Sequence, residues 1–326
     1  MAWGPPPDRR RSVAVGDGEA RGRGAELGAR LAAGDRSAAP AALNLLETRT
    51  AREGAAALVS AAGEGAGHVI GITGPPGVGK STLLSALLHE WRSRGLAVAV
   101  LAVDPSSKRS GGALLGDRAR IEHDPADRDV FIRSMAAGER LGGLAPATRA
   151  AAQALANAFD VVVIETVGVG QSETDVAEAA DTVAVVVQPA SGDALQFLKA
   201  GIMEVPDVLV VTKADLGAPA RRAEEDLRAA LGALGADAPV LTVSAIAPTQ
   251  GIAALADALA THGENRDRVR VRRLGALADF VHEHGERGLR ALGGRRAAVR
   301  WLAEQDESLD EPTLYGLLER RNQPNG

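Results

Sequence analysis

The sequence predicts an α/β fold in which a mostly parallel sheet is covered by helices on both faces. Two observations support this prediction. Short runs rich in Val and Ile alternate with stretches of helical periodicity, a pattern typical of parallel strands joined by helices. The chain also has 326 residues, of which 45% are hydrophobic, so it can bury a substantial core across about two domains. Helical extensions are expected on both sides of this unit.

The composition argues against several classes of protein. Lys and Arg number 37 and Asp and Glu number 42, and the resulting net charge of −5 argues against a nucleic-acid partner. The absence of cysteine excludes a disulfide scaffold, thiolate metal sites and a cysteine nucleophile. No apolar run approaches the length of a membrane span, so we expect no membrane association. The lack of cysteine fits a reducing compartment, and we expect a cytoplasmic location.

The first part of the chain predicts a tail followed by helices. Residues 1–24 are rich in arginine and glycine and predict a disordered tail. Residues 25–66 predict an N-terminal helical segment. Within it, Ser37 is a candidate N-cap for a helix over 38–49, and a second helix is expected over 52–61.

The alternating α/β region is expected over 67–262, and charged helices over 263–326 follow it. The candidate strands are 68–73, 97–104, 129–133, 160–165, 182–188, 207–212 and 239–243. The candidate helices between them are 79–94, 146–158, 193–203 and 219–234. The last segment carries an apolar stripe at helical spacing, which can pack on the same chain or on a second one. The stripe consists of Leu274, Leu277, Val281 and Leu289.

A phosphate-binding loop is the strongest signal in the sequence. It follows a candidate strand, precedes a candidate helix and matches G-x-x-x-x-G-K-[ST]. The matching residues are Gly74, Pro75, Pro76, Gly77, Val78, Gly79, Lys80 and Ser81, and Thr82 follows them. The glycines allow backbone N–H groups to surround phosphate oxygens, Lys80 can reach the β- and γ-phosphates, and Ser81 can ligate Mg²⁺. The motif predicts a P-loop nucleoside triphosphatase but does not identify the base.

Carboxylates that follow two later strands are candidate magnesium ligands. Asp104 ends one strand, on the side of the sheet where the phosphate loop lies, although a turn aspartate is the alternative. For Asp117 the residues alone leave a metal ligand and a loop aspartate equally open. Glu165 ends another buried strand, and the backbone N–H of Gly168 can contact a γ-phosphate. We expect Lys80, Glu165 and Gly168 to take part in hydrolysis.

Two short motifs predict that the base is guanine. Thr212, Lys213 and Asp215 fit [NT]-K-x-D after a late strand. A carboxylate at Asp215 can accept hydrogen bonds from N1–H and the exocyclic amine of guanine, a pair of donors that adenine lacks. The Lys213 stem can lie over the purine. Ser244 and Ala245 follow the last strand, where a backbone N–H can bind the guanine O6 atom.

Longer strings resemble the methylmalonyl-CoA mutase-associated GTPases of the MeaB/ArgK type. The strings are LAVDPSSKRSGGALLGDRARI (101–121), FIRSMAAGERLGGLA (131–145), IETVGVGQSETDVA (164–177) and SGDALQFLKAGIMEVPDVLVVTKAD (191–215). The resemblance runs from about Gly28 to Ala254. Departures from the family pattern are Thr212 in place of Asn, the Lys108-Arg109 pair and a weakly matching C-terminal region.

The resemblance implies a metallochaperone-type GTPase that uses GTP, GDP and Mg²⁺ and is a homodimer. Such proteins gate the loading of adenosylcobalamin into an acyl-CoA mutase and protect that mutase. The implied partners are the mutase and a cobalamin adenosyltransferase. The implied metal neighbours are Ser81, Asp104, Asp117 and Glu165, and residues 188–204 correspond to an additional switch. Hydrolysis is expected to be slow without the partner.

Two other functions remain possible on the sequence. One is a kinase linked to arginine or ornithine transport, which would be expected to use ATP, against the Asp215 signal. The other is a metal-insertion GTPase of the nickel type, which the lack of cysteine makes a poor fit.

Overall fold

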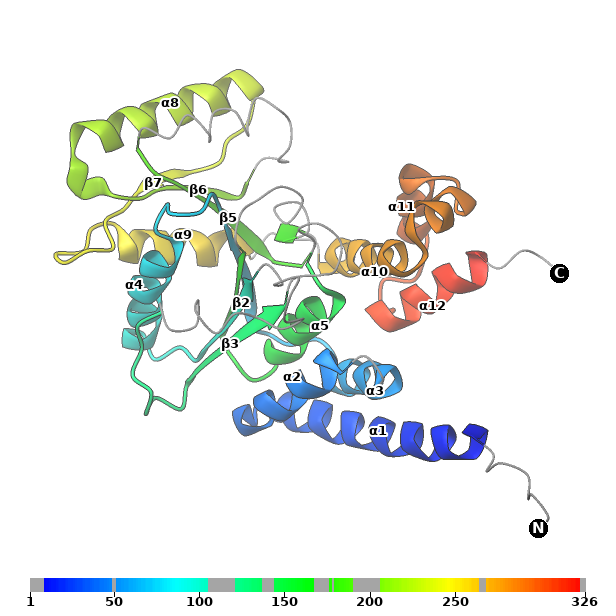
Figure 1. Cartoon of the computed structure of the whole chain (residues 1–326). Helices are drawn as coiled ribbons and strands as arrows, with labels where there is room; N and C mark the ends of the chain where they lie inside the picture. The colour runs from blue at the N-terminus through cyan, green and yellow to red at the C-terminus, as the bar shows by residue number, and fades with distance from the viewer. Residues whose placement is uncertain are drawn as a thin grey trace, which may run out of the picture.

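A computed structural model describes residues 9–48, 51–104, 121–136, 144–166, 176–177, 179–189, 206–263 and 268–322 (Figure 1). Seven strands form one sheet in the order β3-β2-β4-β1-β5-β6-β7. All neighbouring strands in it are parallel, which confirms the predicted fold class. The strands are β1 (His68–Thr73), β2 (Val98–Asp104), β3 (Val130–Ala136), β4 (Val161–Thr166), β5 (Thr182–Val187), β6 (Val208–Val211) and β7 (Val240–Thr242).

The sheet is buried on both faces because its strands are mostly apolar on both faces. All six residues of β4 and of β5 are buried, for example. Alternate side chains of each strand enter two separate cores. Helices α4 (Lys80–Ser93) and α9 (Ile252–Gly263) cover one face. Helices α5 (Pro146–Leu155) and α8 (Ala218–Leu234) and the N-terminal helices cover the other.

The N-terminal region departs from two predictions. Helix α1 (Arg9–Ala32) includes residues that we expected in a disordered tail over 1–24. It packs on α3 (Arg52–Ala62), and a Cβ on Gly28 would lie only 2.3 Å from the Leu58 carbonyl oxygen. The backbones therefore approach so closely that only a glycine fits there.

The predicted cap at Ser37 is also wrong. Residues Arg36–Ala38 form a short 3₁₀ turn, η1, and α2 begins only after it, at Ala39–Glu47. The capping acceptor is the side chain of Asp35, which receives the Ser37 backbone N–H at 3.0 Å. An aspartate two residues upstream can make this bond before the helix starts, so it competes with serine for the cap.

The C-terminal helices form a core of their own. Helices α10 (Arg268–Ala291), α11 (Arg295–Ala303) and α12 (Glu311–Asn322) pack around Phe280, Leu277 and Leu314. The predicted apolar stripe thus packs within the same chain, with Leu277 and Leu289 buried there. Helix α10 is bent at Gly285, whose φ of 62° and ψ of −166° are open mainly to glycine.

The parallel topology brings the carboxyl ends of the strands to one edge, which we call the nucleotide edge. The phosphate loop follows the central strand β1, and Glu165 lies on the neighbouring strand β4, one position before its last residue. The expected helix over 193–203 lies outside the described residues. Among the helices of the described ranges, none combines the length and apolar character needed to cross a bilayer.

Candidate functional site

The phosphate loop adopts the backbone that its glycines permit. It joins β1 to α4, and the φ angles of Gly74, Gly77 and Gly79 are 148°, 79° and 95°. A Cβ on Gly74 would lie 2.1 Å from the Val186 carbonyl oxygen, whereas Gly77 and Gly79 have open space at that position. The first glycine therefore allows the loop to pass close to β5, and the other two allow it to turn.

Lys80 is held at the base of this loop. Its side chain is 7% exposed, and its Nζ donates to the carbonyl oxygens of Gly74 at 2.7 Å and Pro75 at 3.0 Å. A buried ammonium needs such acceptors, because an uncompensated charge is costly away from water. The contacts place a positive charge beside the loop, as phosphate binding requires.

Ser81 and Glu165 form the contact that fits a divalent cation. The Ser81 Oγ donates to Glu165 Oε1 at 3.1 Å, and Glu165 is 7% exposed at the end of β4. Since the hydroxyl proton is directed to the carboxylate, the oxygen lone pairs of Ser81 stay available to a metal ion. A hydroxyl and a carboxylate oxygen next to a phosphate loop are the donors that Mg²⁺ prefers, so these residues fit that ion.

The guanine motif forms a second loop at the same edge. Lys213 has a φ of 58° and directs its Nζ to the side-chain oxygen of Gln188, the first residue after β5. The Ala214 N–H donates to the Val243 carbonyl oxygen at 3.0 Å. The buried Ser244 Oγ donates to Asp215 Oδ1 at 3.0 Å. These bonds fix the exposed Asp215 carboxylate, which is the group expected to bind the base.

Thr212 connects the two loops. It is 5% exposed, and its Oγ1 lies 2.7 Å from the carbonyl oxygen of Val78 in the phosphate loop. The same hydroxyl lies 3.0 Å from the Val187 carbonyl oxygen, which also receives the Thr212 N–H at 2.9 Å. Threonine thus ties its loop to the phosphate loop without the amide of an asparagine.

The remaining predicted residues are distributed as follows. Asp104 is the last residue of β2 and so lies at the nucleotide edge, although its side chain is outside the described set. Asp117 and Gly168 lie outside the described residues altogether. Thr82 is exposed on α4, and Ala245 is half-buried beside Ser244. No sequence pattern predicts the bond between Gln188 and Lys213, because Gln188 follows β5 and Lys213 follows β6, so the two are brought together only by the sheet.

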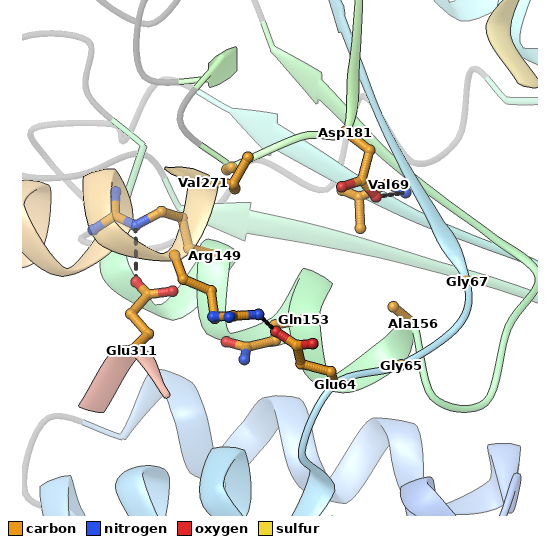
Figure 2. A pocket seen from close by; sticks show the side chains of 12 residues that line it. Glu64, Gly65, Gly67, Val69, Arg149, Gln153, Ala156, Asp181, Val271 and Glu311 are labelled. Atoms are coloured by element: carbon orange, nitrogen blue, oxygen red, sulfur yellow. Dashed lines mark hydrogen bonds and ion pairs between the residues drawn. The ribbon is translucent and has the colours of Figure 1, made fainter. Parts of the chain in front are cut away.

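A pocket of about 80 Å³ lies away from this site (Figure 2). It is found at the amino ends of β1 and β5, an edge we call the amino edge, where α5 meets α10 and α12. Arg149 of α5 is 6% exposed there and pairs with Asp279 of α10 and, at 3.9 Å, with Glu311 of α12. The Asp181 carboxylate accepts the Val69 N–H at 2.9 Å. No sequence motif identifies this cluster.

Residues Glu283 and His284 of α10 take part in packing between helices. Glu283 accepts hydrogen bonds from Tyr315 at 2.7 Å and Arg52 at 2.8 Å, which lowers the pKa of its carboxyl group. The ring of His284 packs on Phe280, with centroids 4.5 Å apart. Within the described ranges, no group of three or more His, Asp or Glu side chains could hold a metal ion.

Comparisons with known proteins agree with this geometry. A family model described as "Methylmalonyl Co-A mutase-associated GTPase MeaB" matches residues 39–284. A Caulobacter vibrioides protein named "Putative GTPase" is 44% identical over 246 residues, which is 72% of this chain and 75% of that protein. A Pyrococcus horikoshii protein of the same description is 49% identical over 58% of this chain. The chain spans 60% of the length of that relative.

One solved structure extends the likeness to the fold. The crystal structure of a protein named "LAO/AO transport system kinase" matches with a TM-score of 0.57 and 28% sequence identity. The match covers 87% of this chain and 97% of that chain. The likeness therefore includes the sheet and most of the helices around it.

Proposed function

The chain belongs to the methylmalonyl-CoA mutase-associated GTPase MeaB family, and on that premise we propose that it is a regulatory GTPase. It binds and slowly hydrolyses GTP, and it passes its nucleotide state to an adenosylcobalamin-dependent acyl-CoA mutase. The observation that supports this most directly is the bond from Ser244 to Asp215, at the same sheet edge as the phosphate loop. It presents a fixed carboxylate where a nucleotide held by the loop would place its base.

Different residues at the nucleotide edge would bind the phosphates and the base. Loop amides and Lys80 would bind the phosphates, and Ser81, Glu165, Asp104 and Asp117 would hold Mg²⁺. That ion, when bound, neutralises charge on the β- and γ-phosphates. Within the chain, Glu165 orients the Ser81 hydroxyl through the 3.1 Å bond. The Gly168 N–H would contact the γ-phosphate.

Base selection follows from hydrogen-bond chemistry. The Asp215 carboxylate accepts two donors from guanine, and an adenine in its place leaves a desolvated carboxylate unpaired. We expect calorimetry to find GTP and GDP bound at least about a hundredfold more tightly than ATP and ADP. Equal or tighter ATP binding would contradict a GTPase and favour the transport-linked kinase.

A shape-conserving test of the base contact uses Asp215→Asn, which replaces the carboxylate with a neutral amide. The new amide can donate to the C2 carbonyl of xanthine and no longer accepts the guanine amine. We expect the variant to lose GDP affinity and to gain affinity for xanthosine diphosphate. Asp226→Asn, at an exposed position on α8, is the matched control and should leave both affinities unchanged.

The partner is tested by capture and by turnover. The chain is immobilised with a non-hydrolysable GTP analogue or with GDP and exposed to candidate cobalamin-dependent acyl-CoA mutases and a cobalamin adenosyltransferase. We expect a mutase to be retained in a nucleotide-dependent manner and to accelerate GTP hydrolysis at saturation. Retention that is the same in both nucleotide states, with no change in turnover, would contradict the proposal. Sedimentation of the free chain tests the expected homodimer.

A further inference from the structure

Helix α11 carries an exposed basic face at the end of the molecule remote from the sheet (Figure 1). The buried side of this helix consists of Ala298 and Leu302, which lie in the core of the C-terminal helices. The exposed side, which we call the basic face, consists of Arg295, Arg296, Val299, Arg300 and Ala303. These positions share one side of the helix because they recur at intervals of three and four residues.

The charge of this region differs from that of the rest of the chain. Residues 287–303 include five arginines and no acidic residue, in a chain whose net charge is −5. The nearest acidic residues in the sequence are Glu286 and Glu304. Within the described residues, neither forms an ion pair with an arginine of this stretch. The basic face is thus a local concentration of positive charge on a chain that is otherwise acidic, and such a patch attracts an acidic surface.

Arg296 and Arg300 lack the acidic partners that other arginines of the chain have. Arg92, for example, pairs with Asp127 at 2.8 Å. In the part of the chain that the structure describes, neither Arg296 nor Arg300 takes part in an ion pair or a hydrogen bond. The two arginines are four residues apart on one helix, so their charges repel each other. An anionic group close to both would relieve this repulsion.

The first turn of α11 is also electrostatically unfavourable. The helix begins at Arg295 and continues with Arg296, its first turn has no acidic residue, and Gly294 provides no side-chain cap. Cations are disfavoured at the N-terminus of a helix, where the helix dipole is positive. The arginines therefore do not serve the stability of the helix, which points to a role in binding.

The chemistry of the basic face favours an acidic protein surface over other anionic partners. Val299 is 37% exposed between the arginines, and a partner protein can bury it while the arginines pair around it. One exposed apolar residue on a helix of nine residues cannot anchor that helix in a lipid surface. A nucleic acid would be repelled by the acidic remainder of the chain.

We propose that the basic face of α11 is the surface through which the chain binds an acidic patch on its partner protein. The inference rests on the proposed function, which makes that partner an adenosylcobalamin-dependent acyl-CoA mutase. Carboxylates of the partner would pair with Arg296 and Arg300, and Val299 would be buried between them. Because the arginines are exposed to solvent, the association should weaken as the salt concentration rises.

The experiment measures the capture of candidate mutases by the full chain at several salt concentrations, in the nucleotide state that retains the mutase. The variant Arg296→Glu/Arg300→Glu reverses both charges. We expect it to weaken mutase binding about tenfold or more at low salt and to make the remaining affinity less sensitive to salt. The variant Arg296→Lys/Arg300→Lys keeps both charges and should retain most of the affinity.

Two controls separate binding from folding. Arg221→Glu/Arg222→Glu makes the same change of charge at two exposed positions of α8 and should leave mutase binding unchanged. The α11 variant itself should stay folded, since a glutamate in the first turn of a helix suits the helix dipole. We therefore expect urea unfolding to show a variant about as stable as wild type, and calorimetry to show an unchanged GDP affinity.

The outcomes separate this surface from the proposed function. A wild-type chain that retains no candidate mutase in either nucleotide state contradicts the proposed function and this surface with it. A wild-type chain that retains a mutase, with the α11 reversal variant binding it equally well, overturns the surface alone. A loss of the same size in the α8 control also overturns it.

The other possible occupants are tested with the same α11 variant. A change in the sedimentation of the free chain would assign the basic face to a second copy and overturn the proposal. Binding of the wild-type chain to phosphatidylserine vesicles or to duplex DNA that the variant loses would overturn it as well. We expect neither effect.

Discussion

The two edges of the sheet are built in different ways. At the nucleotide edge, the key side chains come from short motifs and bind backbone carbonyl groups or each other at the ends of strands, as Lys80 and Thr212 do. At the amino edge, the charged side chains come from segments far apart in the chain. Arg149 there meets Asp279 and Glu311, from two helices of the C-terminal core.

Because of this difference, we expect substitutions at the nucleotide edge to affect nucleotide binding and substitutions at the amino edge to affect the stability of the fold. Motif residues at the nucleotide edge face a ligand, so their loss should weaken binding with little effect on the fold. The ion pairs of the buried Arg149 side chain join α5 to the C-terminal helices, so their loss should weaken the fold with little effect on binding. Substitutions at four positions test this separation.

The largest effect is expected for Arg149→Met. The change keeps most of the side-chain volume but leaves Asp279 and Glu311 without their buried cation, which should lower the free energy of unfolding by about 3 kcal/mol. Urea unfolding followed by circular dichroism measures it. Arg228→Met is the control, because that arginine is 59% exposed and its helical pair should contribute about 0.5 kcal/mol or less.

For the same Arg149 variant, GDP affinity should stay within about twofold of wild type, since a twofold change corresponds to under 0.5 kcal/mol. A large loss of GDP affinity would show that the two edges are coupled and would end the proposed separation.

Lys80→Ala should have the opposite profile. Removing a charged donor to the phosphates should weaken GDP binding by about a hundredfold or more. The free energy of unfolding should change by less than about 1 kcal/mol. Calorimetry and urea unfolding on the same preparation measure the two quantities. Near-normal GDP binding in this variant would mean that the loop is not the phosphate site.

Substitution at the bend in α10 is expected to lower the free energy of unfolding by about 2 kcal/mol. Gly285→Ala forces a side chain onto a backbone with φ of 62° and ψ of −166°, which should destabilise the C-terminal core without changing GDP affinity. Gly316→Ala is the matched control, because it lies inside α12 with open space at its Cβ and should be neutral or stabilising. Equal stabilities for both variants would show that the bend is not required.

The smallest expected effect is on the stability of the fold at acidic pH, through the Glu283 carboxylate. Hydrogen bonds from Tyr315 and Arg52 hold the pKa of Glu283 below its ordinary value of 4.5. A lowered carboxyl pKa contributes stability above its unfolded value, and this contribution is lost as the pH falls through the folded value. The thermal midpoint should therefore fall slightly more between about pH 5 and pH 3 in wild type than in Tyr315→Phe. Identical pH profiles for the two proteins would contradict a role for this contact.

Much of the fold followed from local patterns. All seven strands were predicted within a few residues, because strands buried on both faces are nearly continuous runs of Val, Ile and Leu. The phosphate loop was also expected, as were the positions of Asp215 and Ser244 next to strand ends, but the bond between these two side chains was not predicted. The errors occurred where a contact outside the local pattern decided the outcome, as for α1, which is supported by α3.

By itself, then, the sequence determined the sheet, the phosphate loop and the guanine loop, because hydrophobic periodicity and glycine conformations act over a few neighbouring residues. Only the tertiary structure decided that Thr212 binds the Val78 carbonyl, that Arg149 joins α5 to two distant helices, and that the C-terminal stripe packs on its own chain. These contacts join positions tens to more than a hundred residues apart, and their geometry depends on how whole elements pack rather than on any local spacing.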